Sequence, residues 1–184
     1  MKKMEIERRF LLKKIPDTSC MEKSLIKQIY TEYISRDGSI ILTKNELNLG
    51  SFDIFQKRGI LRLREINDEK IEINVKIPKG KYRKEFEAEI PFTRDLSFLI
   101  SSDERKIEKI RYNSTLKNYI LFIDVFKGRH KGIIIEEIEF ISFADMQSYT
   151  PDCEMREILL KHRLSNKNMY FTDVKEIFKR ITNI

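Results

Sequence analysis

Apolar and polar residues alternate along most of this chain, with the period of two that is typical of β-strands with one exposed face. The clearest alternation has Ile71, Ile73, Val75 and Ile77 on one face and Glu72, Asn74 and Lys76 on the other. Further strands are predicted at about 4–12, 25–34, 60–64, 83–90, 109–112, 119–126 and 133–141. Asn67-Asp68 and Arg36-Asp37-Gly38 have the composition of tight turns. The pattern therefore predicts an antiparallel meander in which each strand has one polar face.

Helical spacing of apolar residues is found in three segments, 95–108, 155–162 and about 172–181. The segment 35–58 is less regular and cannot be assigned from its pattern. A length of 184 residues with 41% apolar residues suits a single compact domain that spans residues 1–184.

Strands with one polar face allow two architectures. An antiparallel sheet can cover its apolar face with helices and expose its charges to water, which is the usual α+β arrangement. Alternatively, about eight such strands can close into a barrel whose polar faces line the interior, with helices against the apolar outside. The distribution of charge helps to choose between the two.

The chain is basic, with a formal charge of +7 and a pI near 9.3. A charge of this sign favours polyanionic partners, whether nucleic acid, anionic lipid or a phosphorylated small molecule. Cys20 and Cys153 have neither the spacing of metal ligands nor a secretory context, so we expect reduced thiols in a cytoplasmic protein. Since the apolar runs are far shorter than the roughly 20 residues that span a bilayer, no membrane partner is expected.

Charges of one sign cluster on individual strands. The acidic groups are Glu5/Glu7, Glu85/Glu87/Glu89 and Glu137/Glu139, and the basic groups are Arg62/Arg64 and Lys109/Arg111. Ordinary exposed faces mix both signs, because like charges on one face repel each other. Carboxylates can hold Mg²⁺ or Mn²⁺, and the cation together with Arg and Lys can neutralise a polyphosphate. The segregation therefore indicates a site for a divalent metal ion and a phosphate-rich small molecule.

The order of these motifs resembles the CYTH superfamily, the triphosphate tunnel metalloenzymes. The segment Glu5-x-Glu7-x-Arg9 is similar to the superfamily's Glu-x-Glu-x-Lys signature, and the matches continue in family order to about residue 141. They comprise Gln28-x-Tyr30, Arg62-x-Arg64, Lys76, Arg83-x-Glu85-Phe86-Glu87-x-Glu89-Ile90-Pro91, Lys109-x-Arg111-Tyr112, Asp124-x-Phe126 and Glu137-Ile138-Glu139. The resemblance implies an α+β fold built on an eight-stranded antiparallel β-barrel, with a polar tunnel inside and helices on its flanks.

The resemblance also implies roles for individual residues. The metal-side residues would be Glu5, Glu7, Glu85, Glu87, Asp124, Glu137 and Glu139. The triphosphate-side residues would be Arg9, Arg62, Arg64, Lys76, Arg83, Lys109 and Arg111. Arg9 and Tyr30 match a family lysine and tyrosine that are candidates for positioning or activating the attacking water. The implied activity is a Mg²⁺- or Mn²⁺-dependent triphosphatase, and inorganic tripolyphosphate is the expected substrate because no segment indicates a pocket for a base or a thiazole.

Two departures from the family pattern affect this interpretation. Arginine stays protonated at useful pH, so Arg9 could orient phosphate but could not act as a base, and water activation would depend on a metal or a carboxylate. Residues 37–58 have the place of an insertion, of unknown role. The C-terminal region from about 155 is expected to be helical. Its part from Ser165 to Tyr170 matches the family poorly, although Lys167 within it is a further candidate for reaching the site.

Three other functions stay open at this point. A class IV adenylate cyclase would need an adenine pocket, which no segment indicates. A polyphosphate- or nucleotide-binding protein without turnover is motivated by Arg9. A nucleic-acid partner is not expected, because acids share the polar faces with the bases and would repel a phosphate backbone. A monomer and a homodimer both fit the sequence.

Overall fold

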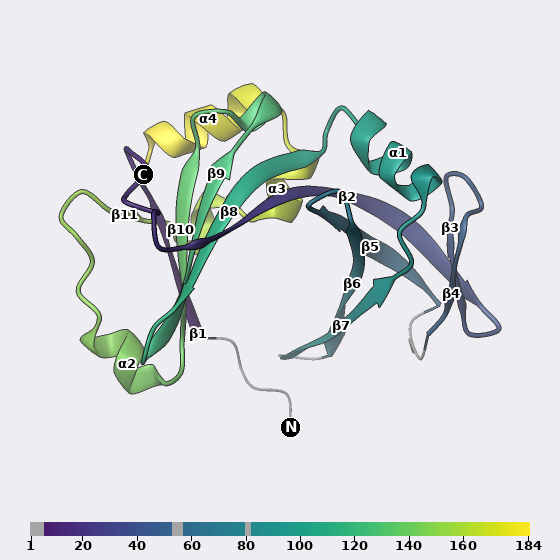
Figure 1. The fold of residues 1–184 in the computed structure, drawn as a ribbon, viewed down its shortest axis with the longest axis horizontal. Coiled ribbons are helices and arrows are strands. Elements are labelled where there is room, and N and C mark those ends of the chain that lie inside the picture. Colours follow the sequence, from purple (N-terminus) through teal and green to yellow (C-terminus); the bar gives the residue numbers. More distant parts are fainter. Residues whose placement is uncertain (1–5, 53–56, 80–81) are drawn as a thin grey trace. The chain divides into compact units, whose positions relative to one another are not determined.

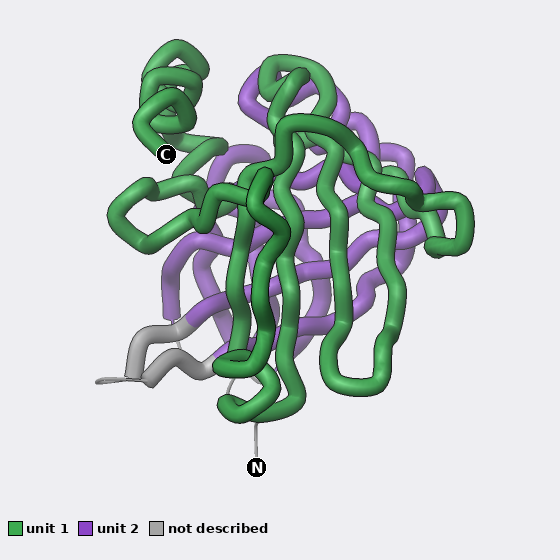
Figure 2. Tube along the Cα trace, turned by 90° about the vertical axis from the view of Figure 1, so that its left-hand side faces the viewer, with its two compact units in different colours: residues 1–25, 107–184 green, residues 26–106 purple. Residues whose placement is uncertain are grey.

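The computed structural model describes residues 6–52, 57–79 and 82–184. The chain divides into two compact units, of which unit 1 comprises residues 1–25 and 107–184 and unit 2 comprises residues 26–106. Figure 2 distinguishes the two units by colour, and Figure 1 labels their elements. The long strand β2 (Glu22–Arg36) begins in unit 1 and continues in unit 2. That residues 1–184 form a single domain stays a prediction.

Unit 1 is a mainly antiparallel sheet with short helices. Its strands are β1 (Ile6–Leu11), β8 (Ile107–Thr115), β9 (Tyr119–Phe126), β10 (Ile134–Phe140) and β11 (Arg156–Glu157). They are paired in the order β11-β1-β10-β9-β8. Its helices are α2 (Phe143–Ser148), α3 (Asn166–Phe171) and α4 (Val174–Thr182), with 3₁₀ turns η1 (Gly128–His130) and η2 (Leu160–His162).

One face of the unit 1 sheet is apolar, as the alternation predicts. Phe10, Ile138 and Phe140 are buried there, and Met146 and Tyr149 pack against them from α2 and the residue after it. Helix α2 contacts β1 and β10, while α3 contacts β8. The opposite face of the same strands carries Glu7, Arg9, Glu137 and Glu139, because successive side chains of a strand point to opposite sides.

Unit 2 is built around a second antiparallel set of strands. Besides β2, these are β3 (Ser39–Leu42), β4 (Asn48–Ser51), β5 (Arg58–Ile66), β6 (Lys70–Lys79) and β7 (Tyr82–Ile90). They are paired in the order β2-β5-β6-β7, and β3 pairs with both β2 and β4. Helix α1 (Arg94–Ser102) follows β7 and contacts β5.

The core of unit 2 lies on the apolar face of β5 and β6. Leu61, Leu63, Ile71, Ile73 and Val75 are at most 1% exposed on that face. Two apolar residues of α1, Leu96 and Ile100, are also buried. The helix begins after Thr93, whose hydroxyl accepts a hydrogen bond from the Leu96 amide at 3.3 Å.

Both predicted tight turns are confirmed. Asn67 and Asp68 join β5 to β6 with φ values of 53° and 58°, and Asp37 and Gly38 join β2 to β3 with φ values of 49° and 81°. Two consecutive residues with positive φ form the type I′ hairpin turn, whose twist matches that of the flanking strands. The segment predicted as an insertion, 37–58, therefore includes a short hairpin, β3–β4, beside β2.

One of the two predicted C-terminal helices is present in the structure. Helix α4 confirms the helix expected at about 172–181, but the helix predicted over 155–162 is wrong. That segment contains β11 and η2 instead, and the Ile158 amide donates a 2.7 Å hydrogen bond to the Arg9 carbonyl. Pairing with β1, which is distant in the sequence, overrides the local helical spacing. Helix α1 likewise ends at Ser102, before the predicted limit of residue 108.

The prediction of an α+β fold with antiparallel strands is confirmed. Among the described residues, the strand pairings form an open path that ends at β11 and β7. These pairings do not close the strands into an eight-stranded barrel, and such closure stays a prediction. None of the helices in the described ranges is long and apolar enough to cross a bilayer.

Candidate functional site

A continuous chain of ion pairs crosses four neighbouring strands on the polar face of unit 1. Its members are Lys109 and Arg111 on β8, Asp124 on β9, Glu137 on β10 and Arg9 on β1. All five were predicted as site residues. The register explains the grouping, because Arg111 lies opposite Asp124 and Arg9 lies opposite Glu137.

Asp124 is the most strongly held member of this chain. It receives a 2.5 Å hydrogen bond from Lys109 Nζ and two from Arg111, at 2.7 Å from Nε and 2.8 Å from Nη2. Burial by itself would raise the pKa of Asp124, but the charges and hydrogen bonds of Lys109 and Arg111 outweigh it and hold this pKa well below its ordinary value. Burial lowers the pKa of Lys109 to about 7, which the Asp124 charge offsets in part.

Glu137 lies between two guanidinium groups. Arg9 Nε is 3.1 Å from its Oε2 atom, and Arg111 Nη2 is 3.8 Å from its Oε1 atom. Arg9 also donates a 3.2 Å hydrogen bond to the backbone carbonyl of Leu164, in the segment between η2 and α3. Arg9 and Glu137 are 15% and 17% exposed, so this end of the chain of ion pairs is partly open to solvent.

The pair of carboxylates best suited to a divalent cation is Glu7 and Glu139. They lie directly opposite each other on β1 and β10, which puts their Cβ atoms about 5 Å apart on the polar face. Like charges at this separation are destabilising, and a hard cation that accepts oxygen ligands would relieve the repulsion. Glu7 is exposed and Glu139 is partly exposed, so both are accessible to an ion from solvent.

The other predicted metal-side residues fit a cation less directly. Among the residues that the structure describes, no group of three or more His, Cys, Asp or Glu side chains is arranged to hold a metal ion. Both oxygens of Asp124 contact cationic side chains, and both oxygens of Glu137 face guanidinium groups. Glu5 lies outside the described residues. The metal site of the predicted kind therefore rests on Glu7 and Glu139, and the other metal assignments stay predictions.

The polar face of unit 2 is built from rows of side chains that cross β2, β5, β6 and β7. One row contains Tyr30, Arg62, Asn74 and Glu87, and the next contains Gln28, Arg64, Glu72 and Glu89. Arg62 forms an ion pair with Glu87 at 3.1 Å, and Arg64 forms one with Glu72 at 3.4 Å. Because these two arginines are 13% and 16% exposed, their contacts are largely with other side chains of this face.

Glu85 is the centre of a third group on this face. It accepts a 2.5 Å hydrogen bond from Asn74 Nδ2, and Lys76 Nζ is 3.3 Å from the same carboxylate oxygen. Burial favours a higher pKa for Glu85, but the Asn74 hydrogen bond and the Lys76 charge lower it overall. Glu85 and Glu87, predicted on the metal side, thus contact bases that were predicted on the phosphate side. The side chain of Arg83 lies outside the described residues.

Tyr30 is a largely buried phenol beside two arginines. Gln28 Nε2 donates a 3.2 Å hydrogen bond to its hydroxyl oxygen. Burial raises the pKa of Tyr30, although the charges of Arg62 and Arg64 act in the opposite direction. At neutral pH Tyr30 is therefore protonated, and it can donate its own hydrogen to an acceptor on the polar face.

Three polar residues that β2 and β6 contribute to these rows were not among the predicted site residues. Gln28 is 0% exposed, Asn74 is 3% exposed, and Glu72 is the partner of Arg64. The alternation of β2 and β6 had indicated their face, but their partners depend on strand register, which the local pattern does not show. Lys167, considered as a further candidate, is an exposed residue of α3.

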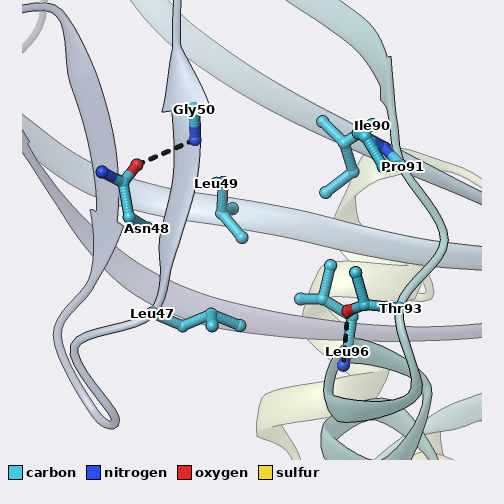
Figure 3. A pocket seen from close by; sticks show the side chains of 8 residues that line it. All are labelled: Leu47, Asn48, Leu49, Gly50, Ile90, Pro91, Thr93 and Leu96. Carbon is cyan, nitrogen blue, oxygen red and sulfur yellow. Dashed lines mark hydrogen bonds between the residues drawn. The ribbon is translucent and has the colours of Figure 1, made fainter.

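A separate cavity of about 240 Å³ lies in unit 2 (Figure 3). It is lined by Leu47, Asn48, Leu49, Gly50, Ile90, Pro91, Thr93 and Leu96, from β4, the end of β7 and α1 with their flanking residues. The lining has no ionisable side chain. Its two polar side chains already have partners, since Asn48 Oδ1 accepts a hydrogen bond from the Gly50 amide at 2.8 Å and the Thr93 hydroxyl caps α1 (Figure 3). This cavity therefore lacks the charges that a phosphate-rich ligand needs.

The chain is similar to two proteins named inorganic triphosphatase. It is 32% identical over 146 residues to one from Acetivibrio thermocellus, a match that covers 78% of this chain and 92% of that protein. It is 28% identical over 148 residues to one from Nitrosomonas europaea, covering 80% of this chain and 83% of that protein. No protein-family model matches the chain.

A solved structure shares the fold. A crystal structure described as that of an inorganic triphosphatase matches with a TM-score of 0.59 and 22% identity, over 94% of this chain and 97% of that chain. A second crystal structure, described as a hypothetical protein, matches with the same TM-score at 24% identity, over 92% of this chain and 99% of that chain. At these identities the likeness concerns the fold.

Proposed function

We propose that this chain, which belongs to the family of the inorganic triphosphatases, hydrolyses inorganic triphosphate to pyrophosphate and orthophosphate. The observation that carries the proposal is the 32% identity to an inorganic triphosphatase over 92% of that protein's length. The charged faces of both units support it, since they carry six of the predicted phosphate-side bases in ion pairs: Arg9, Arg62, Arg64, Lys76, Lys109 and Arg111.

The proposal includes a metal ion and a tunnel, as the superfamily resemblance implies. Glu7 and Glu139 would hold Mg²⁺ or Mn²⁺, together with Glu5, which the resemblance also implies as a metal-side residue. When bound, such an ion would neutralise phosphate charge and favour attack at phosphorus. Closure of the strands into a tunnel would put the polar faces on its inside, as the resemblance predicts.

Basic residues of these polar faces would bind the substrate by exchanging a carboxylate partner for a phosphate oxygen. In the absence of substrate, the Arg62 charge is balanced by Glu87, which is 51% exposed. Ion pairs with such exposed partners stabilise a protein by less than about 1 kcal/mol, so a multiply charged phosphate oxygen can replace the carboxylate at little cost. Arg64 differs, because its partner Glu72 is only 17% exposed. Arg111 stays fixed by Asp124 and presents a preorganised positive charge.

Tyr30 would donate a hydrogen bond rather than remove a proton. Its raised pKa keeps the phenol neutral, and the Gln28 amide occupies one lone pair of its oxygen. A neutral donor beside Arg62 stabilises negative charge that accumulates on a phosphate oxygen during the reaction. Because an arginine side chain does not act as a base in proteins, the attacking water would lose its proton to a carboxylate or to solvent.

The test is phosphate release from tripolyphosphate, measured with Mg²⁺, with Mn²⁺ and with a chelator, and with ATP as a parallel substrate. Metal-dependent release that favours tripolyphosphate over ATP is the expected result. Formation of cyclic AMP from ATP would instead indicate an adenylate cyclase. Saturable binding of tripolyphosphate without release would indicate a binding protein. The cytoplasmic location and the monomeric or dimeric state stay predictions.

A further inference from the structure

Arg9 contacts two parts of unit 1 that are distant from each other in the sequence. Its Nε atom forms an ion pair with Glu137 Oε2 at 3.1 Å, and its Nη2 atom donates a 3.2 Å hydrogen bond to the Leu164 carbonyl. The Arg9 side chain is 15% exposed and Leu164 is 1% exposed, so both contacts are largely shielded from water. A single side chain thus connects β10 with the segment 159–165.

The Leu164 carbonyl lies where the chain changes direction. The 3₁₀ turn η2 ends at His162 and is followed by Arg163, which has a φ of 51°. Helix α3 begins after Ser165, whose hydroxyl accepts a hydrogen bond from the Asn168 amide at 3.2 Å. Leu164 therefore lies between two short helical elements, outside the hydrogen bonding of either. A buried carbonyl without a donor is destabilising, and the Arg9 guanidinium supplies this donor.

The guanidinium group spreads its charge over several nitrogens in one plane, whereas lysine has a single nitrogen on a flexible stem. In Arg9, Nη2 donates the hydrogen bond to the Leu164 carbonyl, and Nε forms an ion pair with Glu137 that lacks hydrogen-bond geometry. A lysine at position 9 could contact the Glu137 carboxylate or the Leu164 carbonyl, but its one nitrogen is poorly suited to hold both in this geometry. The replacement of the family lysine by Arg9 therefore has a structural consequence within unit 1.

The neighbouring arginine supports this interpretation of β1. Arg8, on the opposite face, bonds Glu157 at 2.8 and 3.1 Å and the Tyr149 carbonyl at 3.2 Å. The backbone of the same strand holds Ile158 through the Arg9 carbonyl at 2.7 Å. The side chain of Arg8 and the backbone and side chain of Arg9 thus bind three neighbouring parts of the C-terminal segment, at Glu157, Ile158 and Leu164.

We propose that Arg9 is a positioning residue that anchors the segment 159–165 to β1 and orients Glu137 for its part in the site. The anchoring role concerns the folded chain itself, and the effect on Glu137 rests on the proposed function. Arg9 acts on the reaction through these two partners.

Hydrogen exchange of the backbone amides in 159–166 tests the anchor. We expect exchange in this segment to be at least tenfold faster in Arg9→Lys than in the wild type. Arg156→Lys is the matched control, since it makes the same chemical change in the same region at an exposed side chain, and it should leave the exchange within about twofold. An unchanged rate in Arg9→Lys would overturn the proposal.

Exchange measured at several low urea concentrations separates detachment of the segment from loss of overall stability. Detachment is a local opening, so the faster exchange should persist without urea and vary little with its concentration. If β9 and the segment were accelerated equally in Arg9→Lys, the substitution would merely lower global stability, and the anchoring role would be refuted.

The superfamily resemblance implies that Glu137 joins Glu7 and Glu139 on the metal side, and on that basis its orientation is tested by the metal dependence of the reaction. Arg9→Lys should raise the metal concentration needed for half-maximal phosphate release by at least threefold, while Arg156→Lys should not. An unchanged metal requirement would remove the second part of the proposal. If the wild type released no phosphate, the proposed function would fail, but the exchange experiment would still decide the anchoring role.

Discussion

Glu7 on β1 lies directly opposite Glu139 on β10 in the antiparallel register of unit 1. Two carboxylates in this position repel each other in the absence of a cation. Cross-strand pairs of side chains contribute about 0.2–1 kcal/mol, which sets the scale of this repulsion. The same pair is the strongest indication of a metal site in the part of the chain that the structure describes.

Replacement of Glu139 by Gln should weaken metal binding. With Mn²⁺, the apparent dissociation constant should increase at least tenfold, because one anionic ligand is lost. Calorimetric titration measures this effect. The control is Glu104→Gln at an exposed position, and equal metal affinity in both variants would contradict the assignment.

Asp124→Asn should destabilise unit 1 strongly. It leaves the fully buried Lys109 without its counter-charge, and breaking a buried ion pair in this way typically costs about 3–5 kcal/mol. Denaturant unfolding of this variant, of Lys109→Met and of the double variant gives the coupling energy between the two side chains. If the double variant lost as much stability as the sum of the two single variants, the pair would not be coupled.

Tyr30→Phe removes the proposed donor to phosphate and leaves the aromatic ring in place. We expect kcat for tripolyphosphate to fall about tenfold, which corresponds to roughly 1.4 kcal/mol of barrier. Because the pKa of Tyr30 is raised above its ordinary value of 10, the wild-type pH profile should show no loss of activity from this residue below pH 10. A pH profile whose alkaline limb near pH 8 vanished in Tyr30→Phe would show that the phenol ionises in the working range, contrary to this assignment.

His130 should make the stability of the protein depend on pH in the acidic range. Burial is the main cause that lowers the pKa of this fully buried imidazole to about 4, against 6.5 for an ordinary histidine. The unfolded chain therefore binds a proton at this residue below about pH 6.5, while the folded chain does so only below about pH 4. Stability from His130 is complete above this window and is lost as the pH falls through it, by up to about 1.4 kcal/mol per pH unit.

The comparison of the wild type with His130→Gln isolates this effect from that of the carboxylates. Urea unfolding at several pH values between 4 and 7 should show a shallower pH dependence for the variant, which has no ionisable group at this position. Parallel curves for the two proteins would show that His130 is not held neutral by its surroundings.

The strands and their faces were predictable from the sequence. The alternation in 71–77 identified both β6 and the buried set of Ile71, Ile73 and Val75, because a period of two suits a strand whose two faces meet different environments. The turn at Asn67-Asp68 followed from residues that tolerate positive φ. The charged site residues were assigned to the polar faces by the same period, and the order of their motifs indicated the family.

The partners of those residues depended on the tertiary structure. That Glu7 meets Glu139, or that Arg62 meets Glu87, is a matter of strand register, and register results from the packing of whole strands rather than from any local pattern. The helix predicted at 155–162 failed for a related reason, since pairing with β1 supplied backbone hydrogen bonds that the local spacing could not anticipate.

The sequence by itself determined which side chains share a polar face and which class of ligand that face suits, since both follow from residue type and a period of two. Only the tertiary structure decided that Arg9 holds Leu164, a residue 155 positions further along the chain. Contacts of this kind form when distant segments are packed together, and the backbone carbonyl that accepts the hydrogen bond is chemically the same in every residue.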